Sequence, residues 1–363
     1  MKVAMMLVVV AAIAAIPAQA ETVRVEVTGF VEYSQVNFGI FADVNANDLV
    51  TLYFEVDSDV FLNSSYYPTR GYAIDLASYS LTLGSVSVGL QDPYPAGNTP
   101  YFVLRDNDPA VDGFFTADNN VDWPYPQLPL SEWGRLDIFR NSYEVGYDGD
   151  TLSSLDILDA VGSYDYDGLT NYYFTVIDGW FDAIGLWWQT MTISRVPVDV
   201  AVDIKPGSCP NPFNVNNRGG LPVAILGTAD LDVSMIDPAS VRLAGVAPLR
   251  SDYEDVGTPF EPYTGREDCD LDCNEMESDG FMDLMFKFDS QEVTAALGDV
   301  EARGCVAVGL TGNFWPEYGG GPIAGEDVVR ILRPAVQRQN TDRVMQQVER
   351  PGDLANQPIR PRN

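Results

Sequence analysis

The stretch Leu49-Val50-Thr51-Leu52-Tyr53-Phe54-Glu55-Val56 is rich in β-branched and aromatic residues, and its apolar side chains alternate with more polar ones. A period of two predicts a half-buried β-strand, whereas an amphipathic helix would repeat every three or four residues. The same alternation recurs at residues 23–27 and 79–83. Asp-Gly pairs, which favour tight turns, stand at Asp112-Gly113, Asp148-Gly149, Asp167-Gly168 and Asp178-Gly179. Residues 21–197 are therefore predicted to form an antiparallel β-sandwich, jelly-roll-like in type.

A second β-domain is predicted over residues 198–333. It opens on an alternating run at 198–202, and a continuous apolar run at 221–227 predicts a buried strand. Further strands are expected at 284–288 and 305–310, with a short helical turn at 290–297. The pattern is typical of a smaller immunoglobulin-like sandwich, so the whole chain is predicted to be all-β, with two consecutive antiparallel sandwiches.

The two ends of the chain differ from the predicted domains. Residues 1–20 combine Lys2, a short apolar run and the small-residue pattern Ala18-Gln19-Ala20, which together predict a cleaved signal peptide. No other stretch approaches the roughly 20 apolar residues of a membrane span, so no membrane insertion is expected. Residues 334–363 are sparse in apolar side chains and carry several arginines, which predicts a flexible basic tail. The protein is expected to be secreted, periplasmic or at the cell surface.

Composition narrows the classes of function. The 363 residues include 53 Asp and Glu, 21 Lys and Arg and no histidine, for a net charge of −32. Without histidine, a Ser-His-Asp triad and a histidine-ligated metal are excluded. The negative charge disfavours nucleic acid as a partner and leaves an extracellular glycan or protein. The leading hypothesis is a secreted, non-catalytic binding or structural protein, and the oligomeric state is left open.

An acidic segment at residues 267–283 is the strongest candidate metal site. Read from Glu275, it places oxygen donors at alternate positions around Gly280, where a calcium loop needs a sharp turn. The EF-hand pattern is not met, because its last position is Phe286, so an irregular loop that binds Ca²⁺ and stabilises the second domain is predicted. The alternative is a solvated acidic loop without a metal. The candidate ligands are Glu275, Glu277, Asp279, Asp283, Asp270 and Asp272.

The four cysteines are predicted to form two disulfides, since an even count in an exported chain usually indicates such pairs. Three pairings exist, and the favoured one joins Cys209 to Cys305 and Cys269 to Cys273. The latter bond would shape the acidic segment. A four-cysteine zinc site is the rival interpretation, but the paired CxxC spacing is absent.

Aromatic residues support an alternative function, carbohydrate binding by the first domain. Trp123 and Trp133 flank a proline-rich loop region, where exposed rings could stack on sugars. The rival interpretation is that the tryptophans form core, and it applies most directly to Trp180, Phe181, Trp187 and Trp188. A second alternative is a glycosidase or lyase that uses paired carboxylates, for which the abundance of Asp and Glu gives no specific signal.

Three stretches of the second domain carry a resemblance to a known module. Residues 202–214 (VDIKPGSCPNPFN), 221–227 (LPVAILG) and 236–243 (IDPASVRL) resemble a C-terminal module of bacterial exported proteins. The resemblance implies an accessory β-sandwich attached to diverse secreted proteins, often with an Asp-rich segment before a strand. The first domain resembles the β-rich exported domains of proteins that carry the PEP-CTERM sorting signal, although that signal is absent here.

Overall fold

A computed structural model describes residues 20–107, 111–166, 171–178, 182–273 and 275–332, without the side chains of residues 171–175. Most of the predicted signal peptide, the predicted tail, Trp180 and Phe181 lie outside these ranges. The chain divides into two compact units. The first comprises residues 1–200, 234–241 and 311–324, and the second comprises residues 201–233, 242–310 and 325–363. The described part of each unit is mainly β, as predicted, and none of its helices is long and apolar enough to cross a membrane.

The predicted turns before residue 197 hold only in part. A strand ends at Asp148 as predicted, but Asp112-Gly113 lies inside a strand, while Asp167-Gly168 and Gly179 lie outside the described residues. The strands before residue 197 are β1 (Thr22–Ser34), β2 (Leu49–Asn63), β3 (Thr69–Ile74), β4 (Ser80–Leu83), β5 (Val86–Val88), β6 (Pro100–Arg105), β7 (Val111–Asp118), β8 (Leu128–Trp133), β9 (Ile138–Asp148), β10 (Gly162–Asp165), β11 (Asn171–Asp178) and β12 (Asp182–Arg195). One 3-10 turn, η1 (Gly39–Asp43), joins β1 to β2. The alternation at residues 23–27 and 49–56 is confirmed, because Val25, Leu52 and Phe54 are fully buried on one face.

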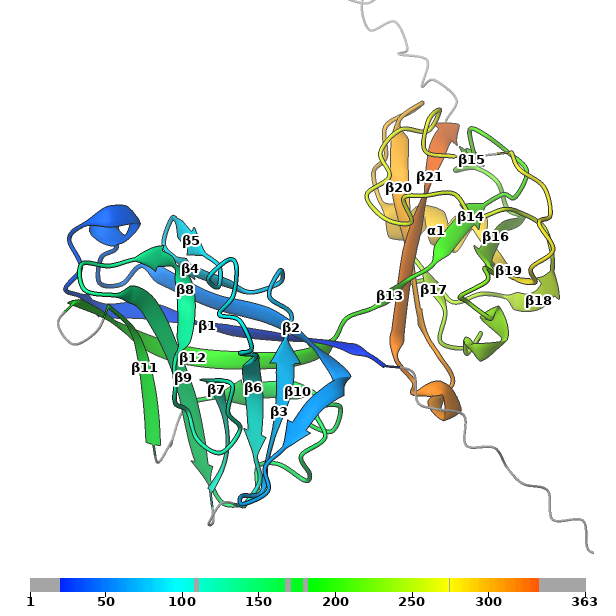
Figure 1. The fold of residues 1–363 in the computed structure, drawn as a ribbon. Helices are drawn as coiled ribbons and strands as arrows, with labels where there is room; N and C mark the ends of the chain where they lie inside the picture. Colours follow the sequence, from blue (N-terminus) through cyan, green and yellow to red (C-terminus); the bar gives the residue numbers. More distant parts are fainter. Residues whose placement is uncertain (1–19, 108–110, 167–170, 179–181, 274, 333–363) are drawn as a thin grey trace, which may run out of the picture. The chain divides into compact units, whose positions relative to one another are not determined.

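Eight of these strands close into an antiparallel ring. The order is β1-β12-β11-β9-β7-β6-β3-β2, and β2 pairs back onto β1. Figure 1 shows β1, β2 and β12 lying side by side along one part of this ring. The first unit thus differs from the predicted sandwich of two separate sheets.

The long strand β2 explains the closure. Its first part pairs with β1 and with β4, and after a register shift beyond Val56 its end at Phe61–Asn63 pairs with β3. Strand β2 therefore pairs with both β1 and β3, which closes the ring. A sequence pattern of period two gives the face of each residue but carries no information on such a change of partner.

The remaining strands are β13 (Val198–Asp199), β14 (Ala201–Ile204), β15 (Pro212–Asn214), β16 (Gly220–Leu226), β17 (Arg242–Leu243), β18 (Arg250–Glu254), β19 (Asp283–Asp289), β20 (Cys305–Asn313) and β21 (Pro322–Leu332). They form one sheet in the order β14-β16-β19-β18 and another in the order β13-β21-β20-β17, with β15 beside β21. The predicted helical turn is α1 (Ser290–Leu297), whose first amides donate to the capping carboxylate of Asp289. Short 3-10 turns, η2 (Val233–Met235) and η3 (Pro316–Tyr318), complete the described elements.

Candidate functional site

The first unit contains an open cleft of about 600 Å³, within the range of natural ligand pockets. Its walls come from the end of β7, the loop before β8, the start of β9 and the end of β11. The lining residues are Asp118, Tyr125, Pro126, Gln127, Asp137, Arg140 and Ile177. Of these, sequence reasoning singled out only the loop around Tyr125, because Asp118, Asp137 and Arg140 belong to no motif.

Strand pairing brings the cleft residues together from distant parts of the sequence. Arg140 on β9 lies in register between Ile177 on β11 and Pro129 on β8. The amide of Asp118 at the end of β7 donates to the carbonyl of Pro126 (2.9 Å), which ties the loop before β8 to the ring. The loop before β8, which forms one wall of the cleft, is therefore tied to the sheet that forms the others.

The loop before β8 presents aromatic rings. The side-chain amide of Asn120 donates to the carbonyls of Trp123 (3.0 Å) and Tyr125 (2.8 Å), so one residue fixes the backbone below both rings. Trp123 is 51% exposed and packs edge-on against Tyr67, with ring centroids 6.1 Å apart. Tyr125 is 67% exposed and lines the cleft itself.

The second predicted tryptophan, Trp133, is 69% exposed at the end of β8 but is not part of the cleft lining. It pairs with Ile138 across a tight turn in which the Gly134 amide donates to the Asp137 carbonyl (2.8 Å). The buried carboxylate of Asp178 accepts from the backbone amides of Arg135 and Leu136. This contact holds the turn that carries Asp137 into the cleft.

Asp118 and Arg140 provide the polar chemistry of the cleft. The Asp118 carboxylate is largely buried, and it accepts from the Tyr94 hydroxyl (3.1 Å) and from the Asn98 side-chain amide (2.9 Å). Burial, and next the charge of Asp118, raise the pKa of Tyr94, so its hydroxyl stays a donor. Among the described residues, the Arg140 guanidinium donates to the Gln127 carbonyl alone, at 3.4 Å. The cleft thus offers a fixed acceptor, a cationic donor and an aromatic ring.

Two carboxylates of the acidic segment, Asp283 and Asp272, accept hydrogen bonds from backbone amides. Asp283, a predicted calcium ligand, is fully buried: its Oδ1 accepts from the Gly227 amide (2.9 Å), and its Oδ2 accepts from the Val256 (2.7 Å) and Gly257 (3.1 Å) amides. Burial raises its pKa, while these three bonds oppose the rise. Asp283 therefore acts as a structural anchor between β16, β19 and the segment after β18.

The other predicted ligands do not converge with Asp283. Asp272 accepts from the Glu267 and Asp268 amides (2.8 Å each), which lowers its pKa, and Asp270 forms an ion pair with Arg330 (2.8 Å). Glu275, Glu277 and Asp279 are exposed. Across the described ranges, no three His, Cys, Asp or Glu residues form a group that could hold a metal ion. Within the described residues the predicted ligands therefore do not gather at one point, and calcium binding stays a prediction.

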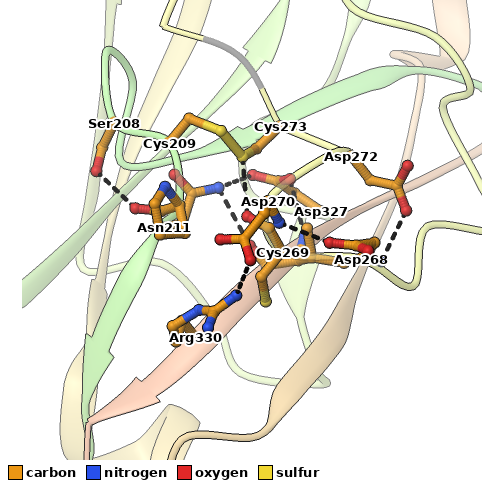
Figure 2. Close-up of a disulfide and its surroundings, with 12 residues drawn as sticks. Ser208, Cys209, Asn211, Asp268, Cys269, Asp270, Asp272, Cys273, Asp327 and Arg330 are labelled. Carbon is orange, nitrogen blue, oxygen red and sulfur yellow. Dashed lines mark hydrogen bonds and ion pairs between the residues drawn. A yellow bond between two sulfur atoms is a disulfide. The ribbon is translucent and has the colours of Figure 1, made fainter.

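Two disulfides are present, but the favoured pairing was wrong. Cys209 pairs with Cys273, as Figure 2 shows, and Cys269 pairs with Cys305; the paired Cα atoms lie 5.5 and 5.7 Å apart. Between Cys269 and Cys273 the chain turns, with the Asp272 amide donating to the Asp268 carbonyl (2.8 Å). This turn buries Cys269 and directs the two cysteines to different partners. The short separation of Cys269 and Cys273 in sequence is therefore no guide to their pairing. Such bonds are typical of an oxidising compartment, outside the cell or in the periplasm.

Comparison with protein-family models, with curated proteins and with solved structures finds no match in any of the three. A functional assignment therefore rests on the geometry of the two regions described above.

Proposed function

We propose that this protein is an exported, non-catalytic binding protein whose first unit binds a neutral polysaccharide in the cleft beside Tyr125. The observation that carries the proposal is the exposed Tyr125 ring at a cleft that also presents Asp118 and Arg140. Sugar rings have apolar faces that pack on aromatic side chains, and hydroxyls that both donate and accept. A carboxylate acceptor and a guanidinium donor beside the ring match both properties.

Charge argues for a neutral rather than an anionic ligand. The net charge of −32 repels a polyanion at long range, and two of the three charged residues that line the cleft are Asp118 and Asp137. A neutral glycan meets no such barrier.

For the C-terminal strands, β13 to β21, we propose the accessory role that the sequence resemblance implies, as an immunoglobulin-like sandwich of their two sheets. The two disulfides support this, because they fix a long irregular segment, residues 255–282, against the strands. Export through the predicted signal peptide agrees with disulfide formation.

Affinity electrophoresis of the full chain in gels containing neutral or acidic polysaccharides tests the proposal. We expect retardation by at least one neutral polysaccharide and none by polyuronates. Tyr125→Ala should abolish the retardation, whereas Tyr253→Ala, which removes a 44% exposed tyrosine on β18, should leave it unchanged. Equal retardation of both variants, or retardation only by acidic polymers, would reject the proposal.

A glycosidase is the second candidate, because Asp118 and Asp137 line the same cleft. Glycoside hydrolysis needs two carboxyl groups about 5 to 10 Å apart on either side of the bond that is cleaved. The assay is release of reducing ends from the retained polysaccharide by the wild-type chain and by Asp137→Asn. Release that is lost in the variant would replace binding by catalysis as the function.

A further inference from the structure

A buried ion pair organises the interior of the second unit. Arg266 Nη1 lies 3.0 Å from Asp327 Oδ1, and both side chains are almost fully buried. The same Nη1 donates to the Val202 carbonyl (3.3 Å), Nε donates to the Pro262 carbonyl (2.6 Å), and Nη2 donates to the Phe260 carbonyl. A guanidinium has five N–H donors, and these contacts use four of them. One N–H of Nη2 thus has no acceptor among the described residues.

Asn211 leaves an acceptor unused beside this pair. Its Nδ2 donates to Asp327 Oδ2 (2.8 Å) and to the Val328 carbonyl (3.1 Å), as Figure 2 shows for the Asp327 contact. Because both partners are acceptors, the amide orientation is fixed. Asn211 Oδ1 is buried, and no hydrogen-bond donor within the described part of the chain reaches it.

Asp203 on β14 provides a second unused acceptor. The residue is 7% exposed, and no donor among the described residues bonds to its carboxylate, which unlike Asn211 Oδ1 is not fully sealed from solvent. By contrast, both oxygens of Asp327 are taken, since Oδ2 accepts from the Ile204 amide and Oδ1 from Arg266. A buried acceptor without a partner is unfavourable, so Asn211 Oδ1 is expected to have one, and the Asp203 carboxylate lines the same space.

One small cavity touches all of these groups. Its volume is about 10 Å³, the size that holds a single water molecule. It is lined by Val202, Asp203, Asn211, Leu226, Phe260, Arg266, Cys273 and Asp327.

We propose that this cavity is a binding site for one structural water molecule. The water donates one hydrogen to the Asp203 carboxylate and the other to Asn211 Oδ1, and it accepts from the remaining N–H of Arg266 Nη2. Three partners are the usual number for a buried water. The water joins β14 to the segment that carries Phe260, Arg266 and Cys273, and so helps to fix the acidic segment on the sheet.

A metal cation fits this cavity less well. Calcium takes six to eight oxygen ligands, whereas here both carboxylate oxygens of Asp327 already accept from N–H groups. The guanidinium of Arg266 also lines the cavity and would repel a cation.

A high-resolution crystal structure of the full chain tests the proposal directly. We expect one density peak about 2.8 to 3.0 Å from an Asp203 oxygen, Asn211 Oδ1 and Arg266 Nη2. A direct contact between Asp203 and Asn211 with no peak between them would overturn the proposal. So would a peak at about 2.4 Å from several oxygens, the distance of a calcium ion.

Magnetic relaxation dispersion, which counts long-lived waters, tests the site in solution. Asp203→Leu should lower the count by one, while Asp203→Asn, which keeps an acceptor, should retain it. Asp230→Leu, at an exposed position of the same unit, is the matched control and should not change the count. An unchanged count in folded Asp203→Leu, or a loss in Asp203→Asn, would contradict the proposal. If Asp203→Leu does not fold, the crystal structure and Asp203→Asn decide.

Discussion

The cleft of the first unit and the buried polar cluster of the second use the same residue type for different purposes. Asp118 lines an open cleft, and the bonds to its carboxylate come from two side chains, Tyr94 and Asn98. Asp283 and Asp327 are buried, and their carboxylate oxygens accept hydrogen bonds from backbone amides. A carboxylate bound to backbone amides determines where segments of chain lie. A carboxylate that is held by side chains at a cleft, such as that of Asp118, can still accept a hydrogen bond from a ligand.

The largest expected effect concerns the disulfides of the second unit, for which the first unit has no counterpart among its described residues. The bonds close loops of 64 and 36 residues. In the chain-entropy model each is worth about 4 kcal/mol. The double variant Cys209→Ser with Cys273→Ser should therefore lose about that much unfolding free energy in urea.

The pairing itself can be checked on the same protein. Digestion before aspartate separates Cys269 from Cys273, because Asp270 and Asp272 lie between them. Mass spectrometry without reduction should then find the linked peptides Cys209–Cys273 and Cys269–Cys305. A peptide linking Cys269 to Cys273 would contradict the structure.

The buried ion pair should matter more than an exposed one. Asp327→Ala leaves the Arg266 charge without its partner, which typically destabilises by about 3 to 5 kcal/mol. Arg24→Ala, which breaks the half-exposed pair with Glu55 (3.2 Å), should cost at most about 1 kcal/mol. Chemical denaturation of the two variants gives both values. Similar losses of unfolding free energy in the two variants would show that burial does not make the Arg266–Asp327 pair more important than the Arg24–Glu55 pair.

Asp203 gives the second unit a pH dependence. Burial, the charge of Asp327 and, more weakly, that of Asp283 raise the pKa of Asp203 to about 7, while Arg266 opposes the rise. The folded chain then binds a proton that the unfolded chain has released, so stability falls as pH rises from about 4 to 7. The raised pKa of Asp327, about 6, acts in the same direction.

Asp203→Asn isolates the contribution of Asp203. The variant should be more stable than the wild type at pH 8, and this advantage should shrink toward pH 4. Urea unfolding across that range measures it. An advantage that is constant with pH would mean that Asp203 does not titrate there.

Calcium should have the smallest effect. Asp270, Asp272 and Asp283 already bond to Arg330 or to backbone amides, which leaves the exposed Glu275, Glu277 and Asp279 as predicted ligands. We therefore expect at most a small rise in the thermal midpoint in millimolar calcium relative to EDTA. A functional site would stabilise by RT ln(1 + [L]/Kd), about 2.7 kcal/mol at one hundred times Kd. A clear rise in the midpoint would restore the predicted calcium loop, and Glu277→Gln would then test its ligands.

Sequence predicts the local features of this fold well. The strands around Leu52 and Phe286 were found because alternation depends only on neighbouring residues. Closure of the ring could not be predicted, because it depends on β1 pairing with both β2 and β12.

In the candidate sites, too, local features could be predicted from the sequence, whereas contacts between distant segments could not. Exposure of Trp123 follows from its loop, but the meeting of Asp118 with Arg140 depends on strand register. Asp283 was predicted as a metal ligand because its spacing in sequence is that of a calcium loop. Only the fold shows that the amides of Gly227, Val256 and Gly257 occupy its oxygens.

Calorimetric titration measures binding of a neutral glycan in the proposed cleft beside Tyr125. Oligosaccharides from the polysaccharide that retards the wild type would be titrated into the wild type, Tyr125→Ala and Tyr253→Ala. We predict a loss of about tenfold or more in affinity for Tyr125→Ala, equivalent to about 1.4 kcal/mol, and none for Tyr253→Ala. Equal affinities for all three proteins would contradict the proposal.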